Sequence, residues 1–248
     1  MKTPGIIGGI GPESTIEYYR LLIKNYREKT NSSDYPEIII NSINMTRMLE
    51  YVFNNQLDEL VTFLANNVKV LEKAGADFAV MASNTPHIVF DRVAETVSIP
   101  MISIVDVCCQ KMQQLDLKKA CLFGTRSTMS AGFYQETAKK YGIELVIPEQ
   151  KDIDFIHDKY MSELVFKDIR EKTRKELIRI AMDIKKKYRI EGLVLGGTEL
   201  PLALSQKDFQ DIIVLNTTVI HVDSIIQRMI EDRDNIRIRN LPADYGIQ

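Results

Sequence analysis

The sequence predicts an α/β fold of two pseudo-symmetric lobes, each a mainly parallel sheet flanked by helices, with a cleft between them. Two observations lead to this prediction. Short apolar runs alternate along the chain with amphipathic helical stretches, which is the pattern of repeated strand and helix units. Three landmarks of the first half of the chain also recur, in the same order, in the second half.

The strand candidates are short apolar runs bounded by Gly, Asn or Pro, because a strand that is buried on both faces is nearly continuously apolar. In chain order they are residues 5–8, 37–40, 78–82, 101–104, 120–123, 145–147, 192–195 and 212–215. Between them, apolar residues recur at helical spacing in residues 57–73 and 171–187. Both stretches are amphipathic, so we expect each to cover one face of a sheet.

The internal duplication assigns the lobes. Residues 6–9 correspond to 122–125, residues 81–86 to 195–200, and residues 100–103 to 213–216, at separations of 116, 114 and 113 residues. One such match arises easily between unrelated strand and helix units, but three in one order point to two similar halves. We therefore expect residues 1–103 with 217–248 to form the first lobe and residues 104–216 the second.

Composition and charge exclude several classes of protein. With 45% hydrophobic and 27% charged residues, the chain is neither disordered nor fibrous. Its 32 Lys and Arg against 34 Asp and Glu leave a net charge of −2, which provides no basic surface for nucleic acid. No apolar run approaches the about 18 residues of a membrane span, and the first residues lack a signal-peptide pattern. We expect a cytoplasmic protein with no membrane or nucleic-acid partner.

The cysteines do not form a metal-binding pattern. Cys108, Cys109 and Cys121 include no Cys-x-x-Cys pair, and the three histidines are far apart in the sequence. Cys121 lies in an apolar run and the other two lie in a helical pattern, so we expect buried, unreactive thiols. The sequence therefore predicts no metal site.

Small polar residues follow several predicted strands. The segment 8–15 (GGIGPEST) lacks the third glycine of a dinucleotide loop and the Lys of a phosphate loop. Ser83, Asn84 and Thr85, Thr125, and Thr198 with Glu199 also come directly after strands. At the carboxyl ends of parallel strands, short donors and helix N-termini form a nest for a carboxylate, although each of these residues is also an ordinary helix cap.

The same segments resemble the aspartate/glutamate racemase superfamily, closest to its aspartate racemase and broad-specificity amino-acid racemase branch, over nearly the whole chain. The resemblance rests on residues 8–15 (GGIGPEST), 81–87 (MASNTPH), 124–129 (GTRSTM), 195–201 (LGGTELP) and 216–221 (NTTVIH). It implies two lobes facing each other across a cleft and a small amino acid or dicarboxylate as substrate. It also implies catalysis with no cofactor, neither pyridoxal phosphate nor metal, and a homodimer.

The resemblance implies two catalytic cysteines, one from each lobe, that remove and return the α-proton on opposite faces of the substrate. The matching positions are Ser83 and Gly197, and neither is a cysteine. A thiolate is accessible near neutral pH, whereas a serine hydroxyl needs a separate base and glycine has no side chain. Loss of one positioned acid or base typically lowers a rate by about 10²–10⁴. Weak or atypical catalysis is therefore expected.

Further site residues are carried over from the family positions. The resemblance implies that Asn84, Thr85, Thr125 and Thr198 hold the substrate α-carboxylate, and Ile10 is a further substrate-binding candidate. Arg47 and Lys167 are candidates for a distal carboxylate, with ordinary surface charge as the alternative. Glu199 is a candidate for proton transfer, with helix capping as the alternative. His87 lies four residues after Ser83, and a buried histidine is the alternative to a role as base.

Three functions remain open from the sequence. The first is a racemase-family enzyme with atypical or weak catalysis. The second is a lyase or decarboxylase in the same cleft, in which Gly197 leaves room for a bulkier substrate. The third is a non-catalytic carboxylate-binding protein. The tail, residues 233–248, carries no motif, and we expect a mobile terminus, with an edge strand or an interface arm as alternatives.

Overall fold

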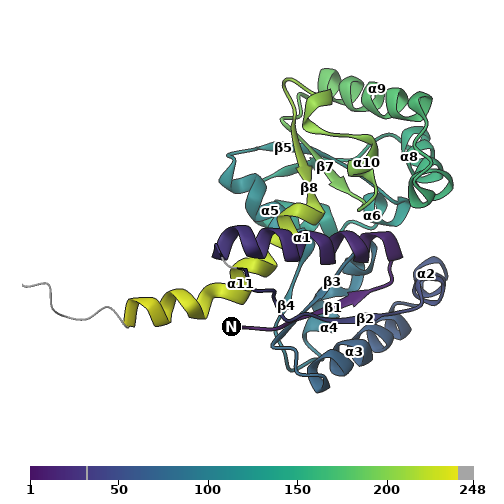
Figure 1. Ribbon diagram of the computed structural model, residues 1–248. Coiled ribbons are helices and arrows are strands. Elements are labelled where there is room, and N and C mark those ends of the chain that lie inside the picture. The colour runs from purple at the N-terminus through teal and green to yellow at the C-terminus, as the bar shows by residue number, and fades with distance from the viewer. Residues whose placement is uncertain (32, 240–248) are drawn as a thin grey trace, which may run out of the picture.

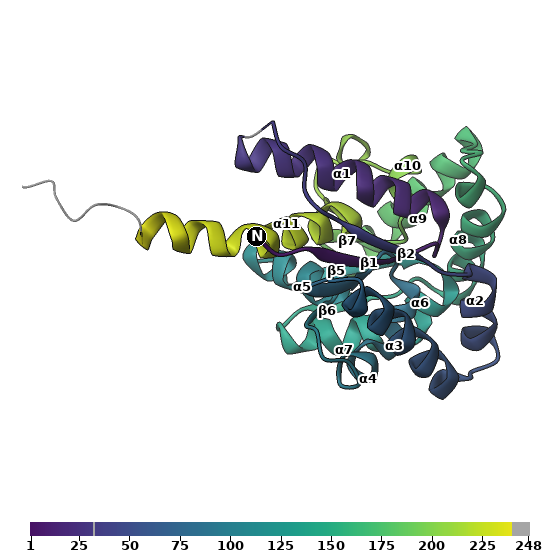
Figure 2. The same ribbon diagram turned by 60° about the horizontal axis from the view of Figure 1, so that its bottom comes forward.

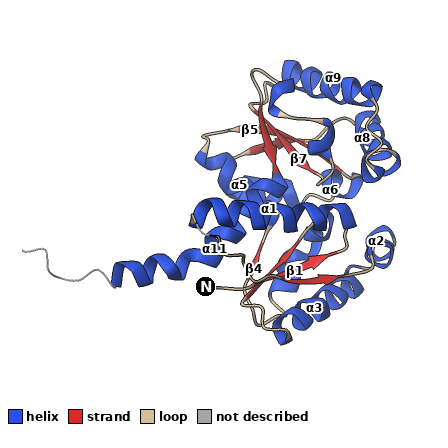
Figure 3. Ribbon diagram, in the orientation of Figure 1, coloured by secondary structure: helices blue, strands red, loops and turns tan. Residues whose placement is uncertain are grey.

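The computed structural model describes residues 1–31 and 33–239 and contains two four-stranded parallel sheets (Figures 1 and 3). The strand order is β2-β1-β3-β4 in the first sheet and β6-β5-β7-β8 in the second. Each lobe thus repeats the same order, as the internal duplication predicts. The two-lobed α/β architecture is confirmed.

The first part of the chain, residues 4–102, contains nine elements in chain order. They are β1 (Pro4–Gly8), α1 (Pro12–Thr30), β2 (Ile39–Ser42), α2 (Met45–Phe53), α3 (Leu57–Lys73), β3 (Phe78–Met81), the 3₁₀ turn η1 (Thr85–Val89), α4 (Phe90–Ala94) and β4 (Met101–Ile102). The chain then passes into the second sheet and its helices.

The second part contains α5 (Ile104–Gln114), β5 (Lys119–Gly124), α6 (Arg126–Ser130), α7 (Phe133–Lys140), β6 (Glu144–Val146), α8 (Gln150–Ser162), η2 (Leu164–Phe166) and α9 (Glu171–Tyr188). It continues with β7 (Gly192–Gly196), α10 (Leu200–Ala203), η3 (Gln206–Asp208), β8 (Ile213–Asn216) and α11 (Thr217–Arg239). The predicted helix 57–73 coincides with α3, and 171–187 is one residue shorter than α9.

Two strand predictions need correction. The predicted strand 37–40 is shifted to Ile39–Ser42, because the polar Asn41 and Ser42 pair with Ile7 and Gly8 of β1. The predicted strand 101–104 ends at Ile102. There the Ser103 side chain accepts a hydrogen bond from the backbone N–H of Asp106 and so begins helix α5.

The two faces of the first sheet are covered by different helices. Ile7 and Met81 pack with residues of α3, whereas Ile6 and Val80 pack with residues of α1 and α11. Side chains alternate across a strand, so β1 and β3 contribute to both cores. Helix α11 thus returns the chain to the first lobe after β8, beside α1 (Figure 2). The exact boundaries of the lobes, 1–103 with 217–248 and 104–216, stay a prediction.

The structure settles one of the alternatives for the tail. Residues 233–239 continue α11, so they do not form an edge strand, while the mobile terminus and the interface arm stay predictions. Figure 1 shows the end of this helix extending beyond the two lobes. The rest of the tail, residues 240–248, lies outside the described residues.

Candidate functional site

A small cavity lies where the carboxyl ends of both sheets meet. Its lining comes from the segments that follow β1, β3, β5 and β7, together with α2 and the end of α8. The lining residues are Ile10, Gly11, Met45, Met48, Leu49, Ser83, Thr85, Thr125, Tyr160, Met161, Val165 and Glu199. Its volume of about 40 Å³ admits a few water molecules. Ligands of parallel α/β sheets bind at this end of the strands.

Five of the site residues predicted from the sequence line this cavity: Ile10, Ser83, Thr85, Thr125 and Glu199. The others, Asn84, Arg47, Lys167, Thr198 and Gly197, are not among the lining residues. Their roles in substrate binding or catalysis stay predictions.

Three threonine hydroxyls join the two lobes at one end of the cavity. The Thr85 hydroxyl lies 3.2 Å from that of Thr125 and 3.3 Å from that of Thr128. The Thr125 and Thr128 hydroxyls are 3.0 Å apart, and Thr125 also caps α6 by accepting from the backbone N–H of Thr128. Hydroxyls both donate and accept, so this cluster can reorient its protons toward an anionic group.

Asn84 is turned into the protein. Its side-chain amide donates to the Thr217 hydroxyl at 3.2 Å and accepts from the Tyr134 hydroxyl at 2.6 Å. With 2% of its surface exposed, Asn84 connects the end of β3 to the first residue of α11 and to α7. The structure thus gives this residue a role in joining the lobes.

Ser83 and His87 do not form a nucleophile and base pair. The His87 ring nitrogen Nε2 accepts a hydrogen bond from the backbone N–H of Ile104, and the ring stacks on Phe90. Burial, with the neighbouring His221, lowers the pKa of His87 to about 3. The imidazole is therefore neutral and its basic nitrogen is occupied, so the alternative of a buried histidine holds. The Ser83 hydroxyl makes no hydrogen bond to another described side chain.

The predicted partners for a distal carboxylate lie at the surface. The Arg47 guanidinium donates to the Tyr51 hydroxyl and lies over the Phe63 ring, and Arg47 does not line the cavity. Lys167 follows η2 and forms an ion pair with Glu13 at the start of α1. That pair links the loop after α8 to the first lobe beside the cavity.

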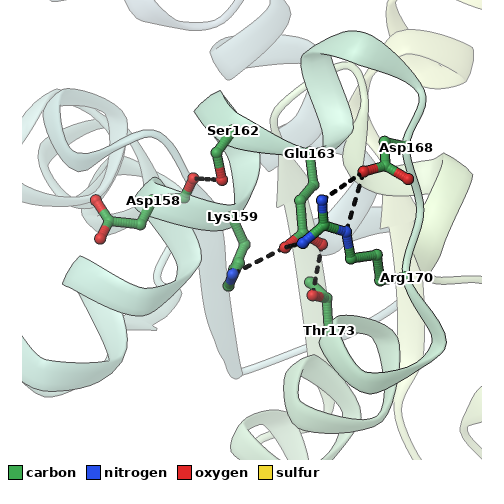
Figure 4. A network of polar contacts seen from close by, with 7 residues as sticks. All are labelled: Asp158, Lys159, Ser162, Glu163, Asp168, Arg170 and Thr173. Carbon is green, nitrogen blue, oxygen red and sulfur yellow. Dashed lines mark hydrogen bonds and ion pairs between the residues drawn. The ribbon is translucent and has the colours of Figure 1, made fainter.

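A buried carboxylate anchors the loop that carries Lys167. Glu163 ends α8 and is almost fully buried, and its carboxylate accepts from Lys159 at 2.8 Å and from Thr173 at 2.5 Å (Figure 4). Arg170 lies 3.7 Å from the same group and forms an ion pair with Asp168. These contacts fix the turn between α8 and α9, which also brings Val165 to the cavity.

Gly197 lies directly against an aromatic ring. A Cβ built at this position would lie 2.4 Å from Cε2 of Tyr160, and 3.2 Å from its hydroxyl oxygen. The Tyr160 hydroxyl donates to Oε2 of Glu199, which also accepts from Thr198 at 2.8 Å. The room that the missing side chain at 197 leaves is therefore filled, and the expectation of space for a bulkier substrate is wrong.

Sequence reasoning missed Tyr160, Met161 and Val165 on the second-lobe side of the cavity. No motif contains Tyr160, which lies 37 positions before Gly197 on α8. Gly197 was the one sequence signal, because a glycine at this position implies that a neighbouring side chain fills the space. The answer depends on how α8 packs against the end of β7.

The three thiols take no part in the cavity. Cys108, Cys109 and Cys121 are buried in the core of the second sheet. Burial and the nearby Asp106 charge raise the pKa of Cys109 to about 12, and burial also raises those of Cys108 and Cys121. All three are therefore neutral and shielded, as expected from the sequence.

The described part of the chain shows neither a metal-ligand cluster nor a membrane-spanning helix. Within residues 1–31 and 33–239, no three His, Cys, Asp or Glu side chains are grouped as a metal ion would require. In the same part of the chain, no helix combines the length and the apolar character needed to cross a bilayer.

Comparisons with known proteins agree with this arrangement. Residues 7–225 match the family model described as Asp/Glu/hydantoin racemase. Over 146 residues the chain is 30% identical to the broad-specificity amino-acid racemase RacX of Bacillus subtilis, covering 57% of this chain and 63% of RacX. The chain thus aligns with less than two thirds of that relative.

Solved structures are similar over most of the chain. An aspartate racemase homologue from Pyrococcus horikoshii is 37% identical with a TM-score of 0.81, covering 92% of this chain and 99% of that one. The aspartate racemase of Picrophilus torridus is 24% identical with a TM-score of 0.72, covering 97% and 100%. At 24% identity, the similarity to the Picrophilus torridus structure shows a shared fold only.

Proposed function

Because the chain belongs to the Asp/Glu/hydantoin racemase family, we propose that it binds a small amino acid or dicarboxylate between its two lobes and acts on it with weak or atypical catalysis. By family, the activity is that of an isomerase, an amino-acid racemase. The proposal includes independence from pyridoxal phosphate and metal, a homodimeric state and a cytoplasmic location.

One observation supports the atypical catalysis above the others. The cavity between the sheets is lined by hydroxyls and by one carboxylate among the described residues, that of Glu199, and no cysteine lines it. Ser83 and Gly197 stand at the two positions where the family resemblance places thiols. A serine hydroxyl without a base does not remove an α-proton, so racemisation by two thiols is not available to this chain.

The carboxylate nest supports substrate binding. Thr85 and Thr125 present hydroxyls at the cavity from opposite lobes, and hydrogen bonds to a charged acceptor are stronger than those between neutral groups. The substrate α-carboxylate is the group that this cluster suits. A non-catalytic carboxylate-binding protein is the second candidate, because the hydroxyl cluster is present while the thiols are absent.

The test combines binding with proton exchange. Purified protein is titrated by calorimetry with L- and D-aspartate and glutamate, and the α-proton signal of each is followed by NMR in D₂O. A two-cysteine relative serves as the positive control. We expect binding, with slow loss of the α-proton signal. Binding without exchange would favour the carboxylate-binding protein, and absence of binding would refute the proposed substrate class.

A further inference from the structure

Tyr160 occupies the space that a side chain at residue 197 would otherwise fill, and it lines the same cavity as Ser83. Its ring atom Cε2 lies 2.4 Å from an ideal Cβ at Gly197, and its hydroxyl oxygen lies 3.2 Å from that point. Tyr160 is 7% exposed and lies on α8, packed in the core of the second sheet. The ring therefore has little freedom to move aside, and Gly197 is the residue that accommodates it.

The Tyr160 hydroxyl holds one oxygen of Glu199. Both Tyr160 and Thr198 donate to Oε2, so this oxygen is fully engaged within the second lobe. The other oxygen, Oε1, would lie 2.9 Å from a Cβ at Gly11, so it faces the loop after β1 in the first lobe. In the Glu199 carboxylate, Oε2 is therefore held by two hydrogen bonds, whereas Oε1 faces the first lobe.

The hydroxyl of Tyr160 stays protonated at neutral pH. Burial and the charge of Glu199 raise its pKa well above its ordinary value. It is therefore a hydrogen-bond donor and not a base. Such a donor fixes the rotamer of the carboxylate without competing with it for a proton.

We propose that Tyr160 is a positioning residue that orients Glu199 as the single proton-transfer group of the cavity, acting on one face of the substrate from the second lobe. This inference rests on the proposed binding of an amino acid between the lobes, and it specifies the atypical catalysis as one-sided α-proton exchange in place of racemisation. It also explains why residue 197 is a glycine: the absence of a side chain there leaves space for the Tyr160 ring, whose hydroxyl orients the Glu199 carboxylate.

The proton balance follows from the geometry. Oε1 of Glu199 takes the α-proton, so the C–H bond breaks, an O–H bond forms, and the electron pair moves into the substrate carboxylate. The hydroxyls of Thr85 and Thr125 donate to that carboxylate as its charge increases. The protonated Glu199 then returns a proton to the same carbon face, after exchange with solvent in D₂O. Ser83, on the opposite face, has no base to relay a proton, so configuration is retained.

The test separates positioning from binding and from folding. Tyr160→Phe keeps the ring beside Gly197 and removes the hydroxyl. The matched control is Tyr18→Phe, which removes another buried hydroxyl, one that contacts His221 and does not line the cavity. For each protein, calorimetry gives the Kd for L- and D-aspartate and glutamate, and NMR in D₂O gives the rate and stereochemistry of α-proton exchange. Circular dichroism reports folding.

We expect wild type to exchange the α-proton with retained configuration. Tyr160→Phe should lower the exchange rate by about tenfold or more while Kd changes less than about threefold, and Tyr18→Phe should change neither. If Tyr160→Phe does not fold, Thr198→Val removes the other donor to Oε2 and is expected to slow exchange. Unchanged exchange in Tyr160→Phe, exchange with full racemisation, or binding without exchange in wild type would each overturn the inference. Absence of binding would refute the proposed function instead.

Discussion

The hydroxyls of Thr85 and Thr125 lie 3.2 Å apart although one follows β3 of the first sheet and the other follows β5 of the second. This contact brings a donor from each lobe to the same point of the cavity. A substrate carboxylate that binds there would be held by both lobes at once.

Thr85→Val should therefore weaken amino-acid binding. The substitution keeps the shape of the side chain and removes a hydroxyl that would donate to a charged group. Loss of such a hydrogen bond should raise Kd about 10- to 100-fold. Calorimetry with aspartate and glutamate measures the change. Thr62→Val is the matched control, because Thr62 is exposed on α3 and its hydroxyl bonds only to its own helix. An unchanged Kd for Thr85→Val would show that the cluster is structural.

Gly197→Cys alone should destabilise the protein. The new Cβ meets the Tyr160 ring, and overpacking of a core typically lowers the free energy of unfolding by about 1–3 kcal/mol. Adding Tyr160→Leu, which removes the ring atoms nearest residue 197, should recover part of that loss. Denaturant unfolding measures both, with Ser83→Cys as a control that adds a thiol to the half-buried first-lobe position. If Gly197→Cys is as stable as wild type, the ring moves aside and the packing argument fails.

The cysteines should be inert in the native protein. Their burial and raised pKa values predict that a thiol reagent at pH 8 leaves Cys108, Cys109 and Cys121 unmodified. In denaturant all three should react, which mass spectrometry counts. Iodoacetamide should also leave amino-acid binding unchanged. Rapid labelling of any one thiol in the folded state would contradict this prediction.

Stability should fall as the solution becomes acidic. The pKa values of His87 and His221 are lowered to about 3 and about 4 by burial, against about 6.5 in an unfolded chain. Below pH 6.5 the unfolded state therefore binds protons that the native state does not. The contribution of the two neutral histidines to the free energy of unfolding is complete above pH 6.5. It is lost as the pH falls toward 4 and then 3, with about 3 kcal/mol from His221 alone.

Urea unfolding between pH 4.5 and 7.5 measures this dependence. In His221→Gln the amide does not titrate, so the free energy of unfolding should change less steeply with pH than in wild type. The comparison concerns the slope, since the substitution also alters the contacts of His221 with Tyr18 and with the Ile102 carbonyl. Equal slopes in the two proteins would show that His221 titrates normally in the native state.

Most of the architecture could be predicted from local pattern. Apolar runs located every strand, since strands buried on both faces have few polar residues. The errors occur where tertiary pairing overrides composition. Asn41 and Ser42 are poor strand formers, yet they pair with β1, while Ile104 is a good strand former and instead begins α5 behind the Ser103 cap.

The site was predicted less completely, for a physical reason. Residues that directly follow strands, such as Thr85, Thr125 and Glu199, are brought together by the parallel sheets themselves. Tyr160 reaches the same cavity from the end of a later helix, and its position depends on how α8 packs. Asn84 follows a strand as well, but its two hydrogen bonds to Thr217 and Tyr134 depend on α11 and α7, which no local motif reveals.

The ion pair between Lys167 and Glu13 and the hydroxyl cluster both hold the lobes together around a cavity of about 40 Å³. Under the proposed function, an amino acid would enter only those molecules in which the lobes have separated enough to enlarge this space. The apparent affinity then equals the intrinsic affinity multiplied by the fraction of open molecules, and an open fraction of about one in a hundred weakens binding about a hundredfold. Under the proposed function, contacts that stabilise the closed form would therefore weaken the apparent affinity for ligand.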